Sequence, residues 1–280
     1  MWLVFQILAY ENDNMLLAID AGNTRTKWAV FNKVGELKHH HVCANAALGA
    51  ADFSPTTLNY DRVVISNVAG EQHAALLANL LAPHGVPISF IKSSLQACNV
   101  DNGYAIAETL GSDRWAALIA AWHIKHAPCV VVNAGTAVTI DALAKRQSIE
   151  HKAQAEFIGG LILPGLNLMQ RSLGLATAQL PTPSLTSHST MQASTSIFAK
   201  NTEDAISAGA LHAIVGAITQ MANALNLQCK QVPYIVISGG NAEMIHTHLL
   251  ANMKNQTLVH EHLVLHGLFL LENFMQSDTQ

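Results

Sequence analysis

Apolar and polar positions alternate along this chain in two ways. Short apolar runs, some with a period of two, predict β-strands, and apolar residues at helical spacing predict helices. Hairpins are expected at 16–31 and 130–144, and further strands at 61–68, 88–91 and 234–240. Helices are expected at 71–82, 111–126 and 202–224, and a last strand leading into an amphipathic helix at 258–274. This order predicts a mixed α/β fold built in layers.

The two expected hairpins match each other in sequence. DAG at 20–22 matches NAG at 133–135, an offset of 113 residues, and Thr26 matches Thr139 at the same offset. One turn of this kind is common in β-rich proteins, so two ordinary hairpins are the simpler interpretation. Two copies about one domain apart favour two related halves with turns that face a shared cleft.

The residues of these turns suit phosphate binding. Gly22 and Gly135 lack a Cβ where the backbone turns sharply or approaches a ligand. Exposed backbone N–H groups and threonine hydroxyls form a concavity that accepts phosphate oxygens. Asp20 cannot bind a phosphate itself, but its carboxylate can hold Mg²⁺ that the phosphates also bind.

Three other segments contain glycine and proline residues that interrupt helices and strands, or are rich in polar residues. Residues 157–166 (FIGGLILPGL) carry three glycines and a proline, which favours a sharply bent connection over a central strand. Residues 176–200, rich in Thr, Ser, Pro and Gln, are typical of a long loop. The glycine pair at 239–240 ends a strand, and fits either a routine turn or close approach to a flat group such as adenosine.

The helix at 111–126 begins with a possible chemical group. Ser112 is the expected N-cap, which places Asp113 in the first turn. An aspartate there usually complements the helix dipole, and a catalytic carboxylate is the alternative.

Composition narrows the function classes. Of 280 residues, 50% are hydrophobic and 12% charged, and the net charge is −4, so a packed core is expected and no basic surface for nucleic acid. The four cysteines form no CxxC, so neither a zinc site nor a disulfide framework is expected. The three consecutive histidines His39–His41 indicate a solvated strand end rather than a metal-binding site.

The N-terminal apolar run is too short to span a bilayer, and no membrane association is expected. Residues 1–14 precede Met15 and the first strand, and are expected to be an extension outside the core or the result of an upstream start.

With these motifs in place, the chain resembles the type III pantothenate kinases of the acetate/sugar kinase–Hsp70–actin superfamily. The resemblance runs from about Met15 to the last helix. Its motifs are DAGNT at 20–24 with Lys27, GSDR at 111–114, AGTAVTID at 134–141, GGLILPG at 159–165, NTEDAISAG at 201–209 and SGGN at 238–241. The family implies an α/β chain with two RNase H-like, actin-like ATPase domains, here 1–122 and 123–280, with a cleft between them. It also implies a cytoplasmic homodimer.

The resemblance assigns roles residue by residue. Asp113 is implied to be the proton acceptor, and Thr202 to touch pantothenate near the dimer interface. The implied ATP-binding residues are Asp20, Ala21, Gly22, Asn23, Thr24, Arg25, Thr26, Lys27 and Thr136. The implied pantothenate-binding residues are Tyr104, Gly111, Ser112, Asp113, Arg114 and Thr202. ATP with Mg²⁺, the latter near Asp20, is the implied cofactor.

One residue departs from the family pattern. Asn133 stands where the family usually has an aspartate associated with a monovalent cation, K⁺ or NH₄⁺. An amide oxygen can still coordinate such an ion, but the site loses a negative charge. Weaker or altered cation dependence is therefore expected.

Three other functions compete with a pantothenate kinase. Relatives described as accessory factors for gene expression suggest a nucleotide-binding regulatory module with little catalysis. A kinase for another small alcohol, or an actin-like assembly protein, would use the same fold. The intact DAGNT and GSDR motifs favour the pantothenate kinase, because a binding module does not need the Asp113 carboxylate.

Overall fold

A computed structural model describes residues 14–54, 58–146, 153–176 and 196–277. The chain divides into two compact units, Met1–Ile91 and Lys92–Gln280. This division lies upstream of the boundary at residue 122 expected from sequence. The segment 111–126 belongs to the second unit because its helix packs against that unit's last helix. The expected N-terminal extension and most of the expected loop at 176–200 lie outside the described residues.

The first unit is a five-stranded sheet with one long helix. The sheet order is β3-β2-β1-β4-β5. Its strands are β1 Leu16–Ala21, β2 Arg25–Phe31, β3 Leu37–Ala44, β4 Arg62–Asn67 and β5 Ile88–Phe90, and its helix is α1 Glu71–Leu81. Strand β1 pairs antiparallel with β2 and parallel with β4. The core cluster includes Ile19, Trp28, Phe53, Ile65 and Leu77, so it joins strands and α1.

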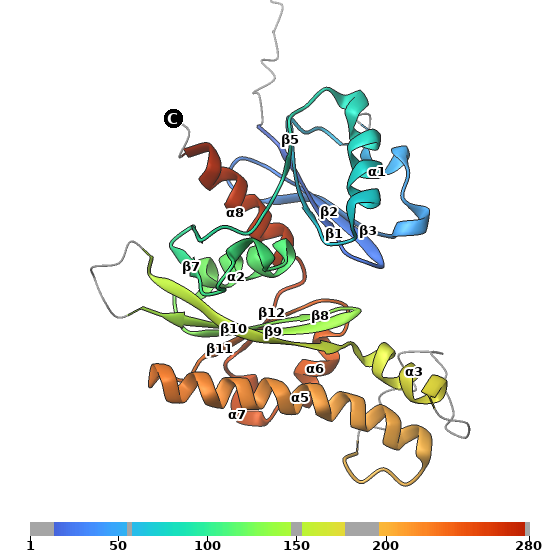
Figure 1. The fold of residues 1–280 in the computed structure, drawn as a ribbon, viewed down its shortest axis with the longest axis vertical. Coiled ribbons are helices and arrows are strands. Elements are labelled where there is room, and N and C mark those ends of the chain that lie inside the picture. The colour runs from blue at the N-terminus through green and yellow to red at the C-terminus, as the bar shows by residue number, and fades with distance from the viewer. Residues whose placement is uncertain (1–13, 55–57, 147–152, 177–195, 278–280) are drawn as a thin grey trace, which may run out of the picture. The chain divides into compact units, whose positions relative to one another are not determined.

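The second unit is built around a seven-stranded sheet ordered β12-β11-β8-β9-β10-β7-β6. Its strands are β6 Gln96–Ala97, β7 Val100–Asn102, β8 Cys129–Ala134, β9 Ala137–Lys145, β10 Ala155–Pro164, β11 Tyr234–Ser238 and β12 Thr257–Val259. Its helices are α2 Ser112–Lys125, α3 Leu166–Ala176, α5 Thr202–Cys229, α6 Ala242–His248, α7 Ala251–Lys254 and α8 Leu263–Ser277. Helices α2 and α8 cover one face and α5 the other (Figure 1).

The two sheets share one topology, which confirms the duplicated actin-like architecture. In the second unit β8 pairs antiparallel with β9 and parallel with β11, and β11 pairs parallel with β12. The first unit has the same arrangement in β1, β2, β4 and β5. Strand β10 then corresponds to β3, and β6 and β7 are additions at the edge of the second sheet.

The expected bent connection at 157–166 is wrong. Residues Ala155–Pro164 form strand β10, which pairs with β9 along its length and shifts register between Phe157 and Gly159. The glycines are accommodated at this irregularity, where Gly159 has φ 131°. Strand β7 pairs only with Ala155–Phe157, so the remainder of β10, including Pro164, needs no donor on that side.

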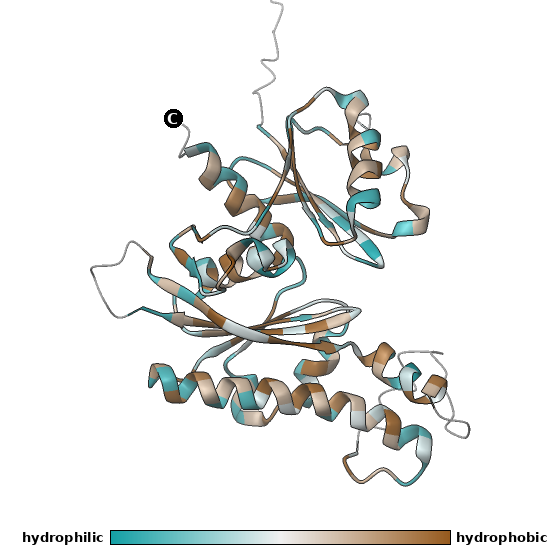
Figure 2. Ribbon diagram, in the orientation of Figure 1, coloured by the Kyte–Doolittle hydropathy of each residue, from teal (hydrophilic) through white to brown (hydrophobic). Residues whose placement is uncertain are grey.

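Helix α5 is long and apolar enough to cross a membrane by length and composition alone. In the second unit it packs on β8 and β9 and contributes Leu211, Ile214 and Ile218 to the core. Its surface alternates between hydrophobic and hydrophilic positions (Figure 2). Contact with the sheet therefore accounts for its apolar composition.

Candidate functional site

The first turn joins β1 to β2. The Gly22 N–H donates to the Arg25 carbonyl at 3.1 Å, and Asn23, Thr24 and Arg25 are exposed. Asp20 lies at the end of β1, opposite Lys27, and is only 7% exposed. A carboxylate oxygen beside an exposed polar turn is a donor that suits a hard cation such as Mg²⁺.

Thr26 differs from its neighbours in this turn, because its side chain is fully buried. Its hydroxyl contacts the Asn45 Oδ1 at 2.9 Å and the His73 Nε2 at 3.0 Å. The hydroxyl is thus engaged inside the unit, and it is the backbone of Thr26 that remains near the turn.

The second turn joins β8 to β9 and is one residue shorter. The Gly135 N–H donates to the Ala137 carbonyl at 3.0 Å, and Thr136 is exposed. Ala134 pairs with Val138, whereas in the first hairpin Ala21 pairs with Thr26. The sequence match of Thr26 with Thr139 is therefore wrong: Thr26 corresponds to Val138, and Thr139 corresponds to Lys27.

Two other motifs meet the backbone of this second turn. The Gly165 N–H donates to the Thr136 carbonyl at 2.9 Å, and the Asn241 N–H donates to the Ala134 carbonyl at 3.2 Å. A Cβ on Gly165 would lie 2.4 Å from the Gly135 oxygen, and one on Gly239 would lie 2.6 Å from the Ala134 oxygen. The glycines of the GGLILPG and SGGN motifs thus allow three backbone segments to pack closely.

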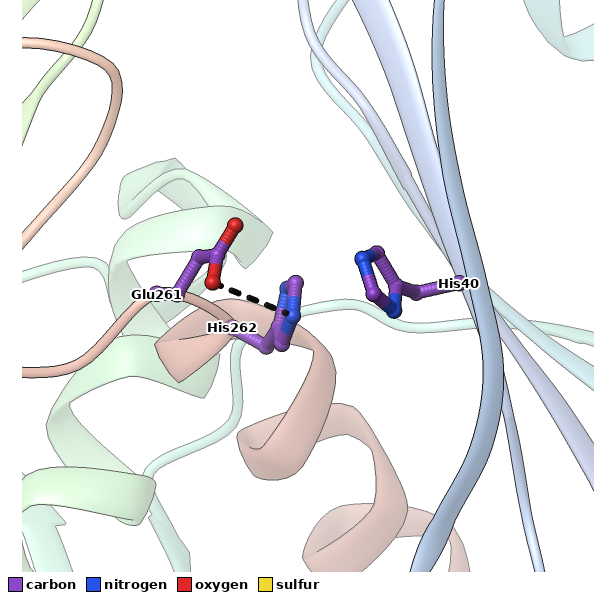
Figure 3. A group of neighbouring side chains, drawn as sticks. All are labelled: His40, Glu261 and His262. Carbon is purple, nitrogen blue, oxygen red and sulfur yellow. Dashed lines mark ion pairs between the residues drawn. The ribbon is translucent and has the colours of Figure 1, made fainter.

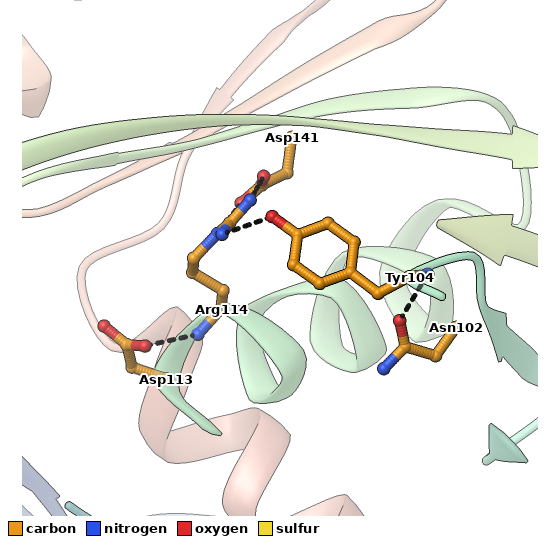
Figure 4. Close-up of polar contacts among 5 residues, drawn as sticks. All are labelled: Asn102, Tyr104, Asp113, Arg114 and Asp141. Atoms are coloured by element: carbon orange, nitrogen blue, oxygen red, sulfur yellow. Dashed lines mark hydrogen bonds and ion pairs between the residues drawn. The ribbon is translucent and has the colours of Figure 1, made fainter. Parts of the chain in front are cut away.

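A polar cluster lies at the start of α2 (Figure 4). The Arg114 guanidinium donates to Asp141 through Nε at 3.1 Å and Nη2 at 2.5 Å, and to the Tyr104 hydroxyl through Nη1 at 3.0 Å. The Asp113 carboxylate accepts the Arg114 backbone N–H at 2.8 Å. Asn102 accepts the Tyr104 backbone N–H at 3.1 Å and so fixes the segment that carries this tyrosine.

Burial dominates the electrostatics of this cluster. Desolvation raises the pKa of Asp113 above its usual value, and the nearby Arg114 lowers it only in part. Burial alone would lower the pKa of Arg114, but the hydrogen bonds and charge of Asp141 more than offset it and raise it. Arg114 therefore stays charged and neutralises Asp141, while Asp113 keeps a basicity above that of an ordinary aspartate.

Asp141 is a site residue that sequence reasoning missed. It is 2% exposed on β9, among apolar neighbours. A lone carboxylate in a buried strand signals a cationic partner, although the sequence does not say which one. Gly160 belongs to the same arrangement, because its Cβ would lie 2.0 Å from the Asp141 Oδ1.

The other residues implied by the resemblance are placed as follows. Gly111, not Ser112, is the N-cap of α2, and Ser112 is buried in the first turn. The N-cap prediction is therefore wrong, although Asp113 does lie in the first turn. Thr202 is the exposed first residue of α5, and Asn133 is half-buried at the end of β8.

The histidine run His39–His41 is exposed on β3 of the first unit. In the second unit, Glu261 and His262 lie directly before α8, and the Glu261 Oε2 is 3.8 Å from the His262 Nε2 (Figure 3). Glu261 is exposed, so this ion pair contributes little to stability.

Comparison with known proteins identifies the family. The family model described as type III pantothenate kinase matches residues 16–224. The "Type III pantothenate kinase" of Methylobacillus flagellatus is 40% identical over 262 residues, covering 92% of this chain and 97% of that protein. The protein of the same description from Aromatoleum aromaticum is 42% identical over 220 residues, covering 74% and 79%.

Solved structures share the fold at low sequence identity. A "conserved putative Baf family transcriptional activator" from Campylobacter jejuni has a TM-score of 0.56 and 19% identity, covering 94% of this chain and 98% of that one. A "putative N-acetylmannosamine kinase" from Listeria monocytogenes has a TM-score of 0.52 and 13% identity, covering 94% and 99%. The fold agrees with the sequence matches, and the chain belongs to the type III pantothenate kinase family.

Proposed function

We propose that this chain phosphorylates pantothenate with ATP, the first step of coenzyme A biosynthesis. The observation that carries the proposal is the cluster at the start of α2. There Asp113, a carboxylate of raised pKa, accepts the backbone N–H of Arg114, whose charged guanidinium is held by Asp141, in a chain that matches the kinase family over residues 16–224.

Asp113 is the proposed general base. It would accept the proton of the pantothenate hydroxyl as that oxygen attacks the γ-phosphorus of ATP, while the bond from this phosphorus to the bridging oxygen of ADP breaks. A base works best when its pKa approaches the operating pH, and burial moves Asp113 in that direction.

Arg114 and Tyr104 are proposed to bind pantothenate. Hydrogen bonds to Asp141 hold the Arg114 guanidinium. Its remaining N–H groups can donate to the pantothenate carboxylate. The Tyr104 hydroxyl accepts from Arg114, so its own proton is available to a substrate acceptor. Gly111, Ser112 and Thr202 complete the proposed pantothenate contacts.

The two turns are the proposed phosphate ligands. Residues Asp20 to Lys27 and Thr136 would contact ATP mainly through backbone N–H groups, which suit anionic oxygens. Asp20 would hold Mg²⁺, which neutralises charge on the phosphates when bound. Asn133 is the proposed ligand of a K⁺ or NH₄⁺ ion, and the binding is expected to be weaker because an amide carries no negative charge.

A homodimer is proposed from apolar surface in the second unit. Leu175, Ile197 and Phe198 are 81%, 68% and 82% exposed. Ile197 and Phe198 line a hollow of about 570 Å³ beside the start of α5, close in sequence to Thr202. Such a patch is typical of an interface, and a second copy is the proposed occupant. A cytoplasmic location is proposed from the family's biosynthetic role.

A coupled assay of ADP release tests this function. The purified chain with ATP and Mg²⁺ is expected to release ADP only when pantothenate is added. Equal ADP release without pantothenate, or no response to it, would favour the regulatory nucleotide-binding module. Repeating the assay with K⁺, NH₄⁺ or neither determines whether Asn133 still supports a cation site.

A further inference from the structure

Three neutral side chains linked by hydrogen bonds lie under the first turn, and two of them, His73 and Asn45, lie outside the residues that the family motifs assign. His73 comes from the first turn of α1, Thr26 from β2, and Asn45 from the short 3₁₀ helix Asn45–Ala47 that follows β3. His73 Nε2 lies 3.0 Å from the Thr26 hydroxyl, and this hydroxyl lies 2.9 Å from the Asn45 Oδ1. The Asn45 Nδ2 then donates to the Gly22 carbonyl at 2.8 Å.

The Gly22 carbonyl determines which atom donates in each of these hydrogen bonds. A carbonyl only accepts, so the amide nitrogen of Asn45 must face it and Oδ1 must face Thr26. The single hydroxyl proton of Thr26 is therefore donated to Asn45. Towards His73 the hydroxyl can then only accept, so His73 must carry a proton on Nε2. Burial lowers the pKa of His73, which is consistent with a neutral Nε2–H tautomer.

Asn45 also holds the turn through its backbone. Its N–H donates to the Thr24 carbonyl at 3.1 Å. Asn45 therefore draws two carbonyl groups of the turn, those of Gly22 and Thr24, towards itself. In a trans peptide the next N–H points the opposite way, and no peptide bond among the described residues is cis. The N–H groups of Asn23 and Arg25 consequently face away from Asn45.

The geometry points to His73, Thr26 and Asn45 as a positioning relay that orients the first turn for the phosphates of a nucleotide. By holding two peptide planes, the relay presents the N–H groups of Asn23 and Arg25 as an anion-binding concavity. None of the three side chains needs to touch the ligand. The relay acts through the turn, and so affects nucleotide affinity rather than the chemical step.

This inference rests on the proposed function only in taking ATP as the ligand. Asn45→Asp keeps the shape of the side chain but places a carboxylate oxygen against the Gly22 carbonyl. His73→Phe removes the first donor, and His73→Gln restores an N–H donor. Tyr60→Phe is the matched control, because it removes a 3.1 Å hydrogen bond to the Phe53 carbonyl in the same core.

The readouts are the KM for ATP, the KM for pantothenate, kcat, and nucleotide affinity titrated without pantothenate. Asn45→Asp and His73→Phe are expected to raise the KM and Kd for ATP about tenfold, the size of one hydrogen bond, with the KM for pantothenate unchanged. His73→Gln is expected to recover most of the affinity, and Tyr60→Phe to retain it. Nucleotide affinity in Asn45→Asp and His73→Phe equal to that of Tyr60→Phe would overturn the relay.

A measurement on the unmodified chain covers the case in which a variant fails to fold. A ¹⁵N–¹H spectrum of the histidine rings, assigned by correlation to the His73 backbone signals, is expected to show His73 protonated on Nε2 alone. A neutral Nδ1–H tautomer would refute the relay. Because titration with ATP alone needs no pantothenate, inactivity towards pantothenate with intact nucleotide binding would reject the proposed function and leave the relay standing.

Discussion

The β1–β2 and β8–β9 hairpins have the same strand arrangement but hold their turns differently. The first turn accepts backbone N–H groups from Asn45 and Val68, and the side chains of Asn45 and the buried Thr26 hold it as well. Backbone holds the second, through Gly165 and Asn241, and the residue equivalent to Thr26 is the apolar Val138. The same backbone path can thus be stabilised by a polar relay or by close glycine packing.

The relay of the first unit and the Arg114–Asp141 pair of the second unit differ in charge. In the first unit the described relay is neutral, whereas the second unit buries the Arg114–Asp141 ion pair, with side chains 7% and 2% exposed. A neutral relay costs little desolvation, and a buried ion pair costs more and is retained where charge has a use. This difference supports the proposed role of Asp113 and Arg114 in substrate chemistry.

Removing the Asp113 carboxylate tests that assignment with the largest expected effect. Asp113→Asn is expected to lower kcat about 10²–10⁴-fold, because the proton acceptor is lost. Glu243→Gln, an exposed carboxylate in the first turn of α6, is the control and is expected to leave kcat unchanged. Near-normal turnover in Asp113→Asn would remove it from the catalytic role.

The pH dependence of kcat/KM and of stability follows from the raised pKa of Asp113. The acid limb of kcat/KM is expected above the usual aspartate value of about 3.9, since the base must be ionised. When the folded pKa exceeds the unfolded one, ionisation opposes folding above the folded pKa. Asp113→Asn is therefore expected to unfold no more easily than the unmodified chain at neutral pH, measured by urea denaturation.

Breaking the ion pair is the next largest effect. Asp141→Asn leaves the Arg114 charge buried without its counter-ion, and is expected to cost about 3–5 kcal/mol in the free energy of unfolding. The double variant Arg114→Met/Asp141→Leu is expected to recover most of that loss but no activity. If Asp141→Asn were as stable as the unmodified chain, the claim that the second unit depends on a buried Arg114–Asp141 ion pair would be contradicted.

Adding a Cβ at two glycines in or beside the second turn tests whether close backbone packing supports it. Gly165→Ala is expected to lose about 1–3 kcal/mol of stability, because backbone atoms lie within 2.6 Å of the new Cβ. Gly135→Ala, whose Cβ meets its nearest atom at 3.5 Å, is the control and is expected to lose less than about 1 kcal/mol. Thermal denaturation measures both, and a reversed order would reject backbone packing as the support of the second turn.

Making the hairpins alike in charge has the smallest expected effect. Asn133→Asp restores the carboxylate at the position equivalent to Asp20. It is expected to raise the apparent affinity for K⁺ about tenfold, or about 1.4 kcal/mol, through one added charge. Titration of activity with K⁺ measures this change. An unchanged response would mean that no cation binds at Asn133.

Local pattern was sufficient to predict most elements of this fold. The strand periodicity and breakers predicted β4, α1 and both hairpins within one or two residues, because these elements depend on nearby sequence. The glycines of β10 misled the prediction, since Gly160 admits Asp141 from the neighbouring strand and Gly159 lies at the register shift. Helix α3 was not predicted. Turn length is also hard to read from sequence, and the match of Thr26 with Thr139 was off by one position for that reason.

The candidate site was only partly readable from sequence. Asp113 and Arg114 were found through a motif, but their partner Asp141 lies 27 residues beyond Arg114. The His73–Thr26 contact spans 47 residues and joins a helix to a strand. Such pairings depend on tertiary packing, which neither periodicity nor spacing specifies.

Identification of the reaction product tests the central claim most directly. The purified chain is incubated with ATP, Mg²⁺ and pantothenate, and the mixture is analysed by ³¹P NMR and mass spectrometry. The expected result is 4′-phosphopantothenate formed in equal amount to ADP. ADP accompanied by free phosphate, with pantothenate unchanged, would contradict a pantothenate kinase and leave an ATPase or a regulatory nucleotide-binding protein.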